Sequence, residues 1–320
     1  MATEGKAAQG AAPAVRWIEV GEEEAGQRID NYLIARLKGV PKSRIYRILR
    51  SGEVRVNSRR VQASDRVAAG DRIRIPPVRV ADRGAAVPAP HFRLPVLYED
   101  EWILAIDKPA GLAVHGGSGI AHGVIESLRS MRPEARFLEL VHRLDRETSG
   151  VLLVAKKRSA LTALHETIRS RAMDKRYLVG VKGRFRNERQ HVRLALVARA
   201  AAEGGKRVHV AADGQPAETI LRRLSRGPEL SLLEAELLTG RTHQIRVHLA
   251  HLGHPVLGDD RYGDFELNRR LRKDGLKRMF LHAASLAFAH PESGEPLVLS
   301  APLPPDLARF RDRFLTDGAP

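Results

Sequence analysis

The strongest candidate for chemistry is the carboxylate of Asp145, which lies in a short polar turn between two apolar runs. The runs at 137–141 and 151–155 are rich in strand-forming residues, so we expect two buried strands that meet at this turn. Arg143 and Arg146 flank the carboxylate, and nearby cations favour the ionised form that a nucleophile needs. The pattern predicts a reactive aspartate held at the rim of a packed sheet.

The same turn also has an ordinary structural interpretation. Asp145 or Thr148 could bond its own backbone in an Asx-type turn, with both flanking arginines simply solvated. Gly150 fits either interpretation, because glycine gives the returning strand a permissive backbone. A lone aspartate in a turn is usually structural, so the case for chemistry depends on the rest of the sequence.

Two further side chains could take part in such a site. Tyr177 lies in the run 175–181, which predicts a strand with a single aromatic ring. A flat ring beside a nucleophile could stack on a nucleic-acid base, although a half-buried tyrosine is also common in strands. Arg246 follows the predicted buried strand 230–238 and falls in the first turns of a predicted helix that ends at Gly253.

Metal and nucleotide sites are weaker hypotheses for this region. The run 115–119 lacks the Gly-Lys-Ser/Thr ending of a P-loop and the spacing of a dinucleotide fingerprint, so we expect a loop that lines the substrate cleft. The histidines near the predicted helix lack a carboxylate-supported His-Glu-x-x-His pattern and do not keep to one helix face. We therefore expect no metal and no nucleotide cofactor. The histidines in question are His243, His248, His251 and His254.

The sequence around these candidates resembles the RluA-type pseudouridine synthases. Residues 142–150 read HRLDRETSG, like the family motif HRLD-x-x-TSG. KPAG and VHGG at 108–117, KRYLVGV at 175–181 and TGRTHQIRVH followed by GHPVLGDDRYG at 239–263 are similar to its other signatures. The resemblance extends nearly to the C-terminus and includes no departure at a signature residue.

This resemblance implies an isomerase that converts uridine to pseudouridine in 23S (large-subunit) ribosomal RNA. It implies that Asp145 is catalytic, that Arg246 pairs with it and that Tyr177 stacks on the target base. It also implies that Arg143 contacts RNA after the nucleotide is flipped out of its stack. Because the reaction transfers no group and changes no redox state, no cofactor is required. Attack on C6, attack on C1′ and abstraction of a sugar proton remain open as roles for the aspartate.

Much of the excess positive charge lies near the N-terminus. The net charge of +16 indicates an anionic partner. Nucleic acid is preferred to a membrane surface, because a basic membrane anchor needs an aromatic and aliphatic face and aromatic residues make up only 5% of the chain. Residues 26–80 contain 14 lysines and arginines against four acidic residues. We therefore expect this segment to bind RNA.

Apolar spacing in this segment predicts two short helices, followed by paired strands at 53–57 and 70–75. Arginines recur on the second helix opposite its apolar stripe, and an ordinary solvated face is the alternative. The segment is similar to an S4 RNA-binding domain, which favours contacts with phosphates. The candidate RNA-binding residues are Lys42, Arg44, Arg47, Arg50 and Arg55.

These features predict an α+β chain with four parts. We expect a flexible leader at 1–25, an S4-like RNA-binding module at 26–80, a linker at 81–94 and the catalytic domain at 95–320. The family resemblance implies that this domain is a mixed, mainly antiparallel β-sheet flanked by helices. Residues from about 184 to 215 are poorly periodic, and we assign them no chemistry.

The composition excludes several other classes of protein. The chain has no cysteine, which rules out disulfides, thiolate nucleophiles and cysteine zinc sites. No secretion signal and no apolar run near the roughly 18 residues of a membrane span occur, so we expect a cytoplasmic protein. An RNA-binding or ribosome-assembly protein would explain the charge but not the signatures. A glycoside hydrolase would need two carboxylates, and only Asp145 is matched.

Overall fold

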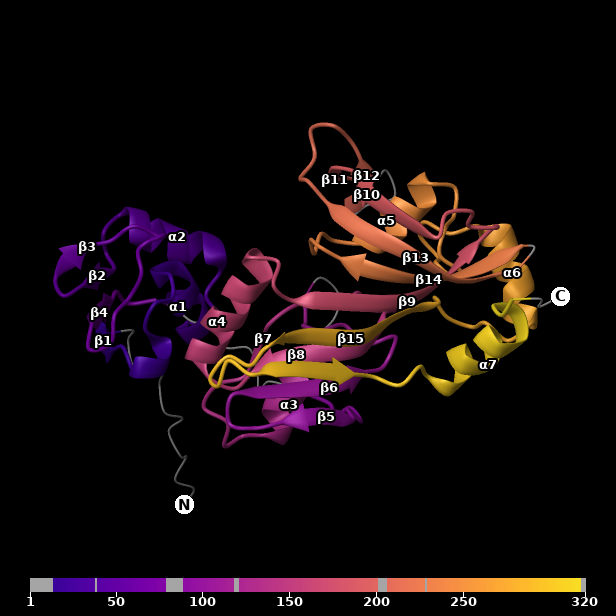
Figure 1. Ribbon diagram of the computed structural model, residues 1–320. Coiled ribbons are helices and arrows are strands. Elements are labelled where there is room, and N and C mark those ends of the chain that lie inside the picture. The colour runs from indigo at the N-terminus through magenta and orange to yellow at the C-terminus, as the bar shows by residue number, and fades with distance from the viewer. Residues whose placement is uncertain are drawn as a thin grey trace, which may run out of the picture. The chain divides into compact units, whose positions relative to one another are not determined.

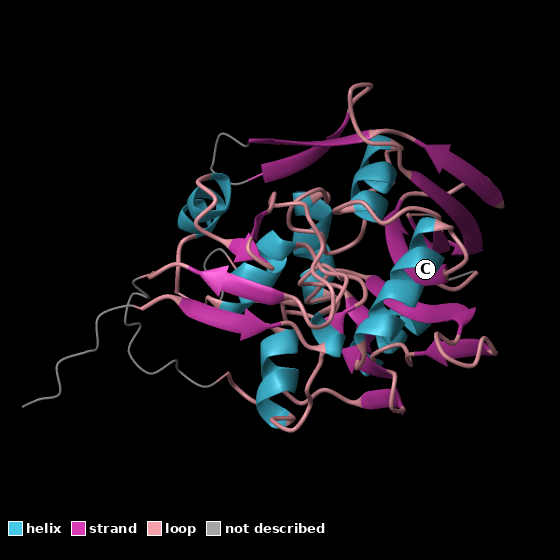
Figure 2. Ribbon diagram, turned by 90° about the vertical axis from the view of Figure 1, so that its left-hand side faces the viewer, coloured by secondary structure: helices cyan, strands magenta, loops and turns pink. Residues whose placement is uncertain are grey.

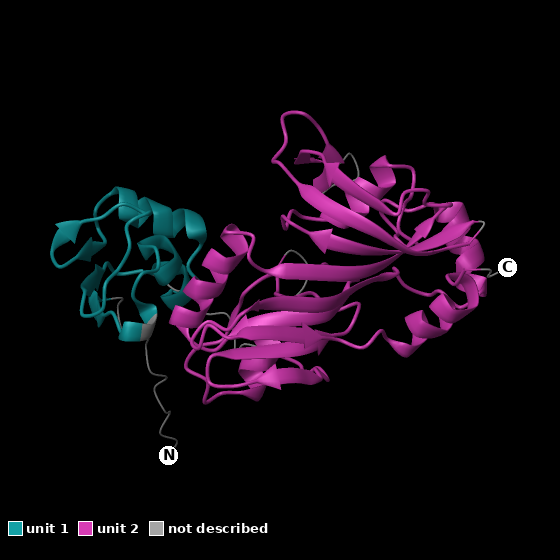
Figure 3. Cartoon of the chain, viewed as in Figure 1, with its two compact units in different colours: residues 1–88 teal, residues 89–320 magenta. Residues whose placement is uncertain are grey.

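The chain divides into two compact units, residues 1–88 and 89–320 (Figure 3). The computed structural model describes residues 14–37, 39–78, 89–117, 121–200, 206–227 and 229–317. Residues 1–13 of the predicted leader and 81–88 of the predicted linker therefore lie outside the described residues. Each unit has its own hydrophobic core, and together they confirm the predicted α+β class.

The N-terminal unit packs two helices on a small antiparallel sheet of order β1-β4-β2-β3 (Figure 1). Its core is formed by apolar side chains of both helices and of the sheet, including Leu33, Ile48 and Ile73. The two predicted helices and the predicted pairing of β2 with β4 are confirmed. The elements are β1 (Arg16–Glu19), a 3-10 turn (Glu22–Glu24), α1 (Ile29–Arg36), α2 (Lys42–Arg50), β2 (Arg55–Val56), β3 (Arg59–Arg60) and β4 (Arg72–Ile75).

The predicted flexible leader, residues 1–25, is too long at its C-terminal end. Residues 16–24 of it contain β1 and the 3-10 turn. β1 pairs with β4 along its whole length, from Arg16 opposite Ile75 to Glu19 opposite Arg72. Val20 follows β1 and is buried in the core of this unit. The pairing gives the backbone of β1 its hydrogen-bond partners, which depend on a strand more than fifty residues away. Local composition does not reveal such a partner.

The C-terminal unit, which contains the predicted catalytic domain, is built on a ten-stranded sheet, whose main path is β10-β13-β14-β9-β15-β8-β6-β5. β15 and β8 pair in parallel, while the other neighbours are antiparallel. The predicted mixed, mainly antiparallel sheet is thus confirmed. The strands are β5 (Val96–Glu99), β6 (Ile103–Lys108), β7 (Glu139–Leu140), β8 (Ser149–Ala155), β9 (Asp174–Lys182), β10 (Arg189–Arg193), β13 (Glu218–Arg226), β14 (Leu230–Leu237), β15 (Leu281–Ala289) and β16 (Pro296–Ser300).

Helices cover both faces of this sheet (Figure 2). Leu152 and Val154 of β8 pack in one cluster with α3 (Val124–Met131) and α5 (Gln244–His251). The alternate residues Val151 and Leu153 pack in a second cluster with α4 (Arg158–Arg169). Burial on both faces explains why the sequence of β8 is a continuous apolar run. A third cluster joins α6 (Phe265–Lys273) to α7 (Pro305–Phe314).

The poorly periodic segment at 184–215 contains β10 and a separate two-stranded sheet, β11 (Leu196–Ala200) with β12 (Lys206–Val210). Most side chains of β11 and β12 are exposed or half-buried, so these strands lack a regular apolar pattern. Among the described residues, no helix has the length and apolar character needed to cross a membrane.

Candidate active site

The loop that carries Asp145 connects β7 to β8 and is fixed by its own backbone. The amide of Thr148 donates to the carbonyl oxygen of Asp145 at 3.1 Å. The carbonyl oxygen of Arg146 accepts from the amide of Gly111 at 2.9 Å and from Nζ of the buried Lys108 at 3.1 Å. The turn therefore does not use the Asp145 carboxylate as its cap, which leaves this group available for other partners.

Gly150 allows the strand after this loop to enter the sheet. Its φ is +110°, and a Cβ atom at this position would lie 2.1 Å from the carbonyl oxygen of Ala283. Ala283 is the residue that pairs with Gly150 where β15 meets β8 in parallel. Only glycine combines this backbone conformation with so close a neighbour. The loop thus reaches the pocket at the point where two parallel strands meet.

Arg246 on α5 links Asp145 to a second, fully buried carboxylate, Asp259. Its Nη1 donates to Oδ2 of Asp145 at 3.0 Å. Its Nε and Nη2 donate to the two oxygens of Asp259 at 2.7 Å and 2.8 Å, a bidentate pair. The Arg246 side chain is 6% exposed and that of Asp259 is 0% exposed. This geometry fixes the guanidinium and therefore the direction from which it meets Asp145.

The electrostatics keep this ion pair charged. Burial alone would raise the pKa of Asp259, but hydrogen bonds from Arg246 and from the amides of Arg261 and Tyr262 outweigh burial and lower it. Burial would lower the pKa of Arg246, and the two carboxylates outweigh that effect and raise it. Arg246 thus remains a permanent cation at Oδ2 of Asp145.

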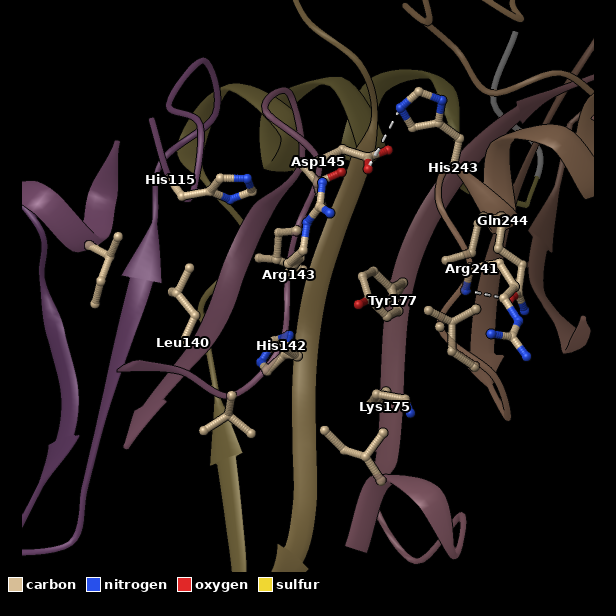
Figure 4. A pocket seen from close by; sticks show the side chains of 18 of the residues that line it. His115, Leu140, His142, Arg143, Asp145, Lys175, Tyr177, Arg241, His243 and Gln244 are labelled. Atoms are coloured by element: carbon tan, nitrogen blue, oxygen red, sulfur yellow. Dashed lines mark hydrogen bonds and ion pairs between the residues drawn. The ribbon is translucent and has the colours of Figure 1, made fainter. Parts of the chain in front are cut away.

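Asp145, Tyr177 and Arg246 all line one pocket of about 730 Å³. Tyr177 projects from β9, and its hydroxyl points into the cavity below Asp145 (Figure 4). Burial, helped by the charge of Asp145, raises the pKa of Tyr177, so its side chain remains a neutral phenol. The Asp145 side chain is 24% exposed and can be reached from solvent. The pocket therefore combines a carboxylate that solvent can reach, a fixed cation and an aromatic ring.

Comparison with known proteins agrees with this arrangement. The family model for RNA pseudouridylate synthase matches residues 103–251, and that for the S4 domain matches residues 27–73. The ribosomal large subunit pseudouridine synthase C of Escherichia coli K12 is 52% identical over 305 residues, 93% of this chain and 96% of the relative. That of Yersinia pestis is 52% identical over 297 residues, 91% of this chain and 93% of the relative. The chain belongs to the RNA pseudouridylate synthase family.

Two solved human structures share the fold of about two thirds of this pseudouridine synthase. Human RNA pseudouridylate synthase domain containing 1 aligns with a TM-score of 0.54 and 29% identity, and covers 68% of this chain and 86% of its own. Human RNA pseudouridylate synthase domain containing 4 aligns with a TM-score of 0.55 and 26% identity, and covers 68% of this chain and 92% of its own. The enzyme is accordingly an isomerase, and the sequence-based assignment to this family is confirmed.

The arginines that flank Asp145 in sequence are not its partners, contrary to the expectation from their spacing. Nε of Arg146 donates to the carbonyl oxygen of Gly111 at 3.0 Å. The Arg143 side chain lines the pocket and has no hydrogen bond or ion pair within the described ranges. Successive side chains in the turn point in different directions, which takes both flanking arginines away from the carboxylate. The partner of Asp145 is instead Arg246, 101 positions away.

Sequence reasoning did not assign Asp259 or His243 to this site. Asp259 lies in the GHPVLGDDRYG signature, but a spacing of 13 residues from Arg246 does not reveal their contact. Nε2 of His243 lies 3.9 Å from Oδ1 of Asp145, and its Nδ1 bonds the hydroxyl of Tyr262 at 2.9 Å. Burial lowers the pKa of His243, although the charge of Asp145 opposes this. A neutral imidazole therefore faces the oxygen of Asp145 that Arg246 leaves unbound.

Two of the other histidines near α5 have structural partners. Nδ1 of His248 bonds the hydroxyl of Thr219 at 3.0 Å, and Nδ1 of His254 bonds the carbonyl oxygen of Lys182 at 2.9 Å. No group of three potential metal ligands occurs in the part of the chain that the structure describes. The predicted loop at 115–119 is described as far as residue 117, and His115 lines the pocket.

The remaining candidate residues lie in the N-terminal unit and do not line this pocket. Ile45, Ile48 and Leu49 of α2 are buried, so the other side of the helix is turned to solvent. Of the five predicted RNA contacts, four are exposed and Arg44 is half-buried. The five residues are Lys42, Arg44, Arg47, Arg50 and Arg55.

Proposed function

We propose that this enzyme converts uridines to pseudouridine in large-subunit (23S) ribosomal RNA, with Asp145 as the catalytic residue. The observation that carries the proposal is the chain of contacts from Asp145 through Arg246 to buried Asp259, beside Tyr177 in one pocket. The two bacterial relatives are named as synthases of the ribosomal large subunit, which supports this RNA as the substrate. The enzyme then acts in the cytoplasm, where ribosomal RNA is located.

The reaction breaks the bond between uracil nitrogen and the ribose C1′, turns the base and rejoins it through carbon. One proton leaves that carbon and one is gained at nitrogen, so no oxidant, reductant or cofactor is consumed. An ionised carboxylate beside the sugar supports this chemistry, either by covalent attack or by taking a proton. Arg246 donates to Oδ2 of Asp145 and orients the carboxylate, while Oδ1 accepts no hydrogen bond from the described residues and is free to react.

The target uridine must leave its stack to reach this carboxylate. Tyr177 is only 7% exposed, so a base that contacts its ring has to enter the pocket. Base flipping supplies such access, and an aromatic face compensates for lost stacking regardless of base identity. Arg143, exposed at the pocket rim, is placed to occupy the vacated position in the RNA. Asp145, Tyr177 and Arg246 thus act on the base and sugar, and Arg143 acts on the neighbouring stack.

The N-terminal unit supplies affinity rather than chemistry. The exposed arginines of α2 suit the phosphates of an RNA backbone, and the match to an S4 domain supports that use. The same unit contributes none of the residues that line the pocket. Binding and catalysis are therefore separable by mutation.

A direct assay tests this function. Purified enzyme is incubated with transcripts of large-subunit ribosomal RNA, and pseudouridine is mapped by chemical labelling and primer extension. We expect modification at a small number of discrete uridines, and loss of the same sites in ribosomal RNA from cells that lack the gene. RNA binding without any pseudouridine would instead identify an RNA-binding or ribosome-assembly protein.

A further inference from the structure

The pocket contains a largely buried lysine, Lys175, that the proposed reaction does not use. Lys175 lies two residues before Tyr177 on β9, and both residues line the pocket. Only 6% of Lys175 is exposed. Among the residues that the structure describes, no side chain or carbonyl forms a hydrogen bond or ion pair with its ammonium group, and the neighbouring Asp174 is bonded by Arg176 instead. The side chain is largely buried, but its ammonium group can be reached from the pocket and is therefore available to a ligand.

The carboxylate next to Lys175 in sequence does not serve as its partner. Asp174 lies on the opposite face of β9, because side chains alternate along a strand. Oδ2 of Asp174 is held by Arg176 at 2.8 Å. Burial lowers the pKa of Lys175, and the charge of Asp174 opposes this only in part. The ammonium group therefore faces the pocket without a protein counter-ion.

The other basic groups at this end of the pocket are already engaged. Nε2 of His142 accepts from the amide of Leu153 at 3.2 Å, and burial lowers the pKa of His142 to about 4, which keeps it neutral. Arg129 donates to the carbonyl oxygen of Leu138 at 2.7 Å and pairs with a carboxylate at 2.8 Å. Arg169 is likewise paired, with Glu166. Among the described residues at this end of the pocket, Lys175 is thus the cation that remains available to a ligand.

The pocket is large enough for RNA groups at both ends. Asp145 lies at one end and Lys175 at the other, with Tyr177 between them (Figure 4). Its volume of about 730 Å³ falls in the upper part of the range of roughly 300–1,000 Å³ found for sites of drug-sized ligands. A sugar at Asp145 and a base at Tyr177 leave the Lys175 end to a further part of the same substrate.

We propose that Lys175 binds an oxygen atom of the substrate RNA at the end of the pocket opposite Asp145. The oxygen belongs to a phosphate group or to a base carbonyl, both of which accept from an ammonium group. In a site with little water, such a charge-assisted bond is stronger than at the surface. The inference rests on the RNA-modifying function above and adds to it a contact that selects and holds the substrate.

The variant Lys175→Met tests this role, because it removes the charge and keeps an unbranched chain of similar length. We expect the affinity for a transcribed ribosomal RNA fragment to fall about tenfold or more, the range for losing a hydrogen bond to a charged group. The melting temperature should stay the same or rise, because an unpaired buried charge is removed. Lys273→Met, the same change at an exposed residue of α6, is the matched control. Lys175→Gln repeats the measurement with a polar side chain.

Two further measurements identify the RNA oxygen. If it belongs to a phosphate, the slope of log affinity against log salt should become shallower by about 0.7 in Lys175→Met. If it belongs to the target base, the slope should not change, and the loss should vanish on a stem-loop with an abasic nucleotide at the modified position. Either result supports the contact.

Normal RNA binding by both Lys175 variants would overturn the proposal. An equal loss of RNA affinity in Lys273→Met would overturn it too, as would a loss of affinity that is accompanied by a lower melting temperature of the Lys175 variants. Binding is measured without turnover, so this outcome is distinct from a failure of the wild-type enzyme to form pseudouridine.

Discussion

The arginines proposed to function in the two units lie in opposite environments, exposed in one and buried in the other. On α2 of the N-terminal unit, Arg47 and Arg50 are exposed and have no ion pair among the described residues. In the catalytic unit, Arg246 is buried and bonded to two carboxylates. An exposed arginine can change its conformation to bind phosphates in different positions, whereas a buried, fully bonded arginine is held in a single geometry. Substitutions in the first unit should therefore change affinity, and those in the second should change turnover.

Replacing Asp145 should give the largest loss of turnover relative to the change in RNA affinity. Asp145→Asn keeps the shape of the side chain but removes its charge and nucleophilicity, so we expect turnover to fall by more than about a hundredfold. RNA affinity should stay within a few-fold of wild type, because the phosphate contacts are unchanged. Single-turnover pseudouridine formation and RNA binding measure the two quantities. Substantial residual turnover would show that another residue performs the chemistry.

Asp259→Asn should affect both turnover and stability. It leaves the buried Arg246 with Asp145 as its only carboxylate partner, and breaking a buried ion pair costs about 3–5 kcal/mol in the free energy of unfolding. We expect kcat to fall while KM changes little, since Asp259 acts through Arg246 and is fully buried. Urea denaturation and steady-state kinetics provide the measurements. The neighbouring Asp260 is exposed, and Asp260→Asn should behave as wild type.

Acid should remove the same stabilisation. The folded pKa of Asp259 is lowered below its unfolded value, so its contribution to stability is present above the unfolded pKa of about 3.9 and is lost as the pH falls below it. We expect the stability difference between wild type and Asp259→Asn to shrink between pH 5 and pH 3. A constant difference over this range would mean that the pKa of Asp259 is the same in the folded and unfolded states, so that its ion pair with Arg246 does not stabilise the fold.

Arg246→Lys should be less severe than the loss of either carboxylate. Lysine keeps the charge but cannot bond Asp145 and both oxygens of Asp259 in one planar arrangement. We expect kcat to fall about tenfold or more, in line with the loss of a hydrogen bond between charged groups. A rise in KM with unchanged kcat would instead mean that Arg246 serves RNA binding. Rapid-quench kinetics at saturating RNA separate the two results.

Helices and strands were predicted correctly from the sequence where the pattern of apolar residues repeats within the element itself. The apolar run of β8 and the spacing of α2 indicated the correct structures because burial repeats along each element. Contacts between distant segments were not predictable from local patterns. The flanking arginines were expected to keep Asp145 ionised, but its partner comes from a helix 101 residues later. Family resemblance pointed to Arg246, whereas no pattern indicated that Asp259 holds it.

The smallest expected effect concerns the arginines of α2. Replacing Arg44, Arg47 and Arg50 together by glutamine removes three positive charges without disturbing the buried face of the helix. Each phosphate contact on single-stranded RNA contributes about 0.7 to the salt slope, so the slope should flatten by up to roughly 2.

KM should rise and kcat should not change, since no residue of α2 lines the pocket. Glutamine at Arg269, Arg272 and Lys273, which are exposed on α6, removes the same charge elsewhere and is the control. Equal slopes for the two triple variants would mean that RNA responds only to net charge. A slope that changes only in the α2 variant would locate phosphate binding on the N-terminal unit.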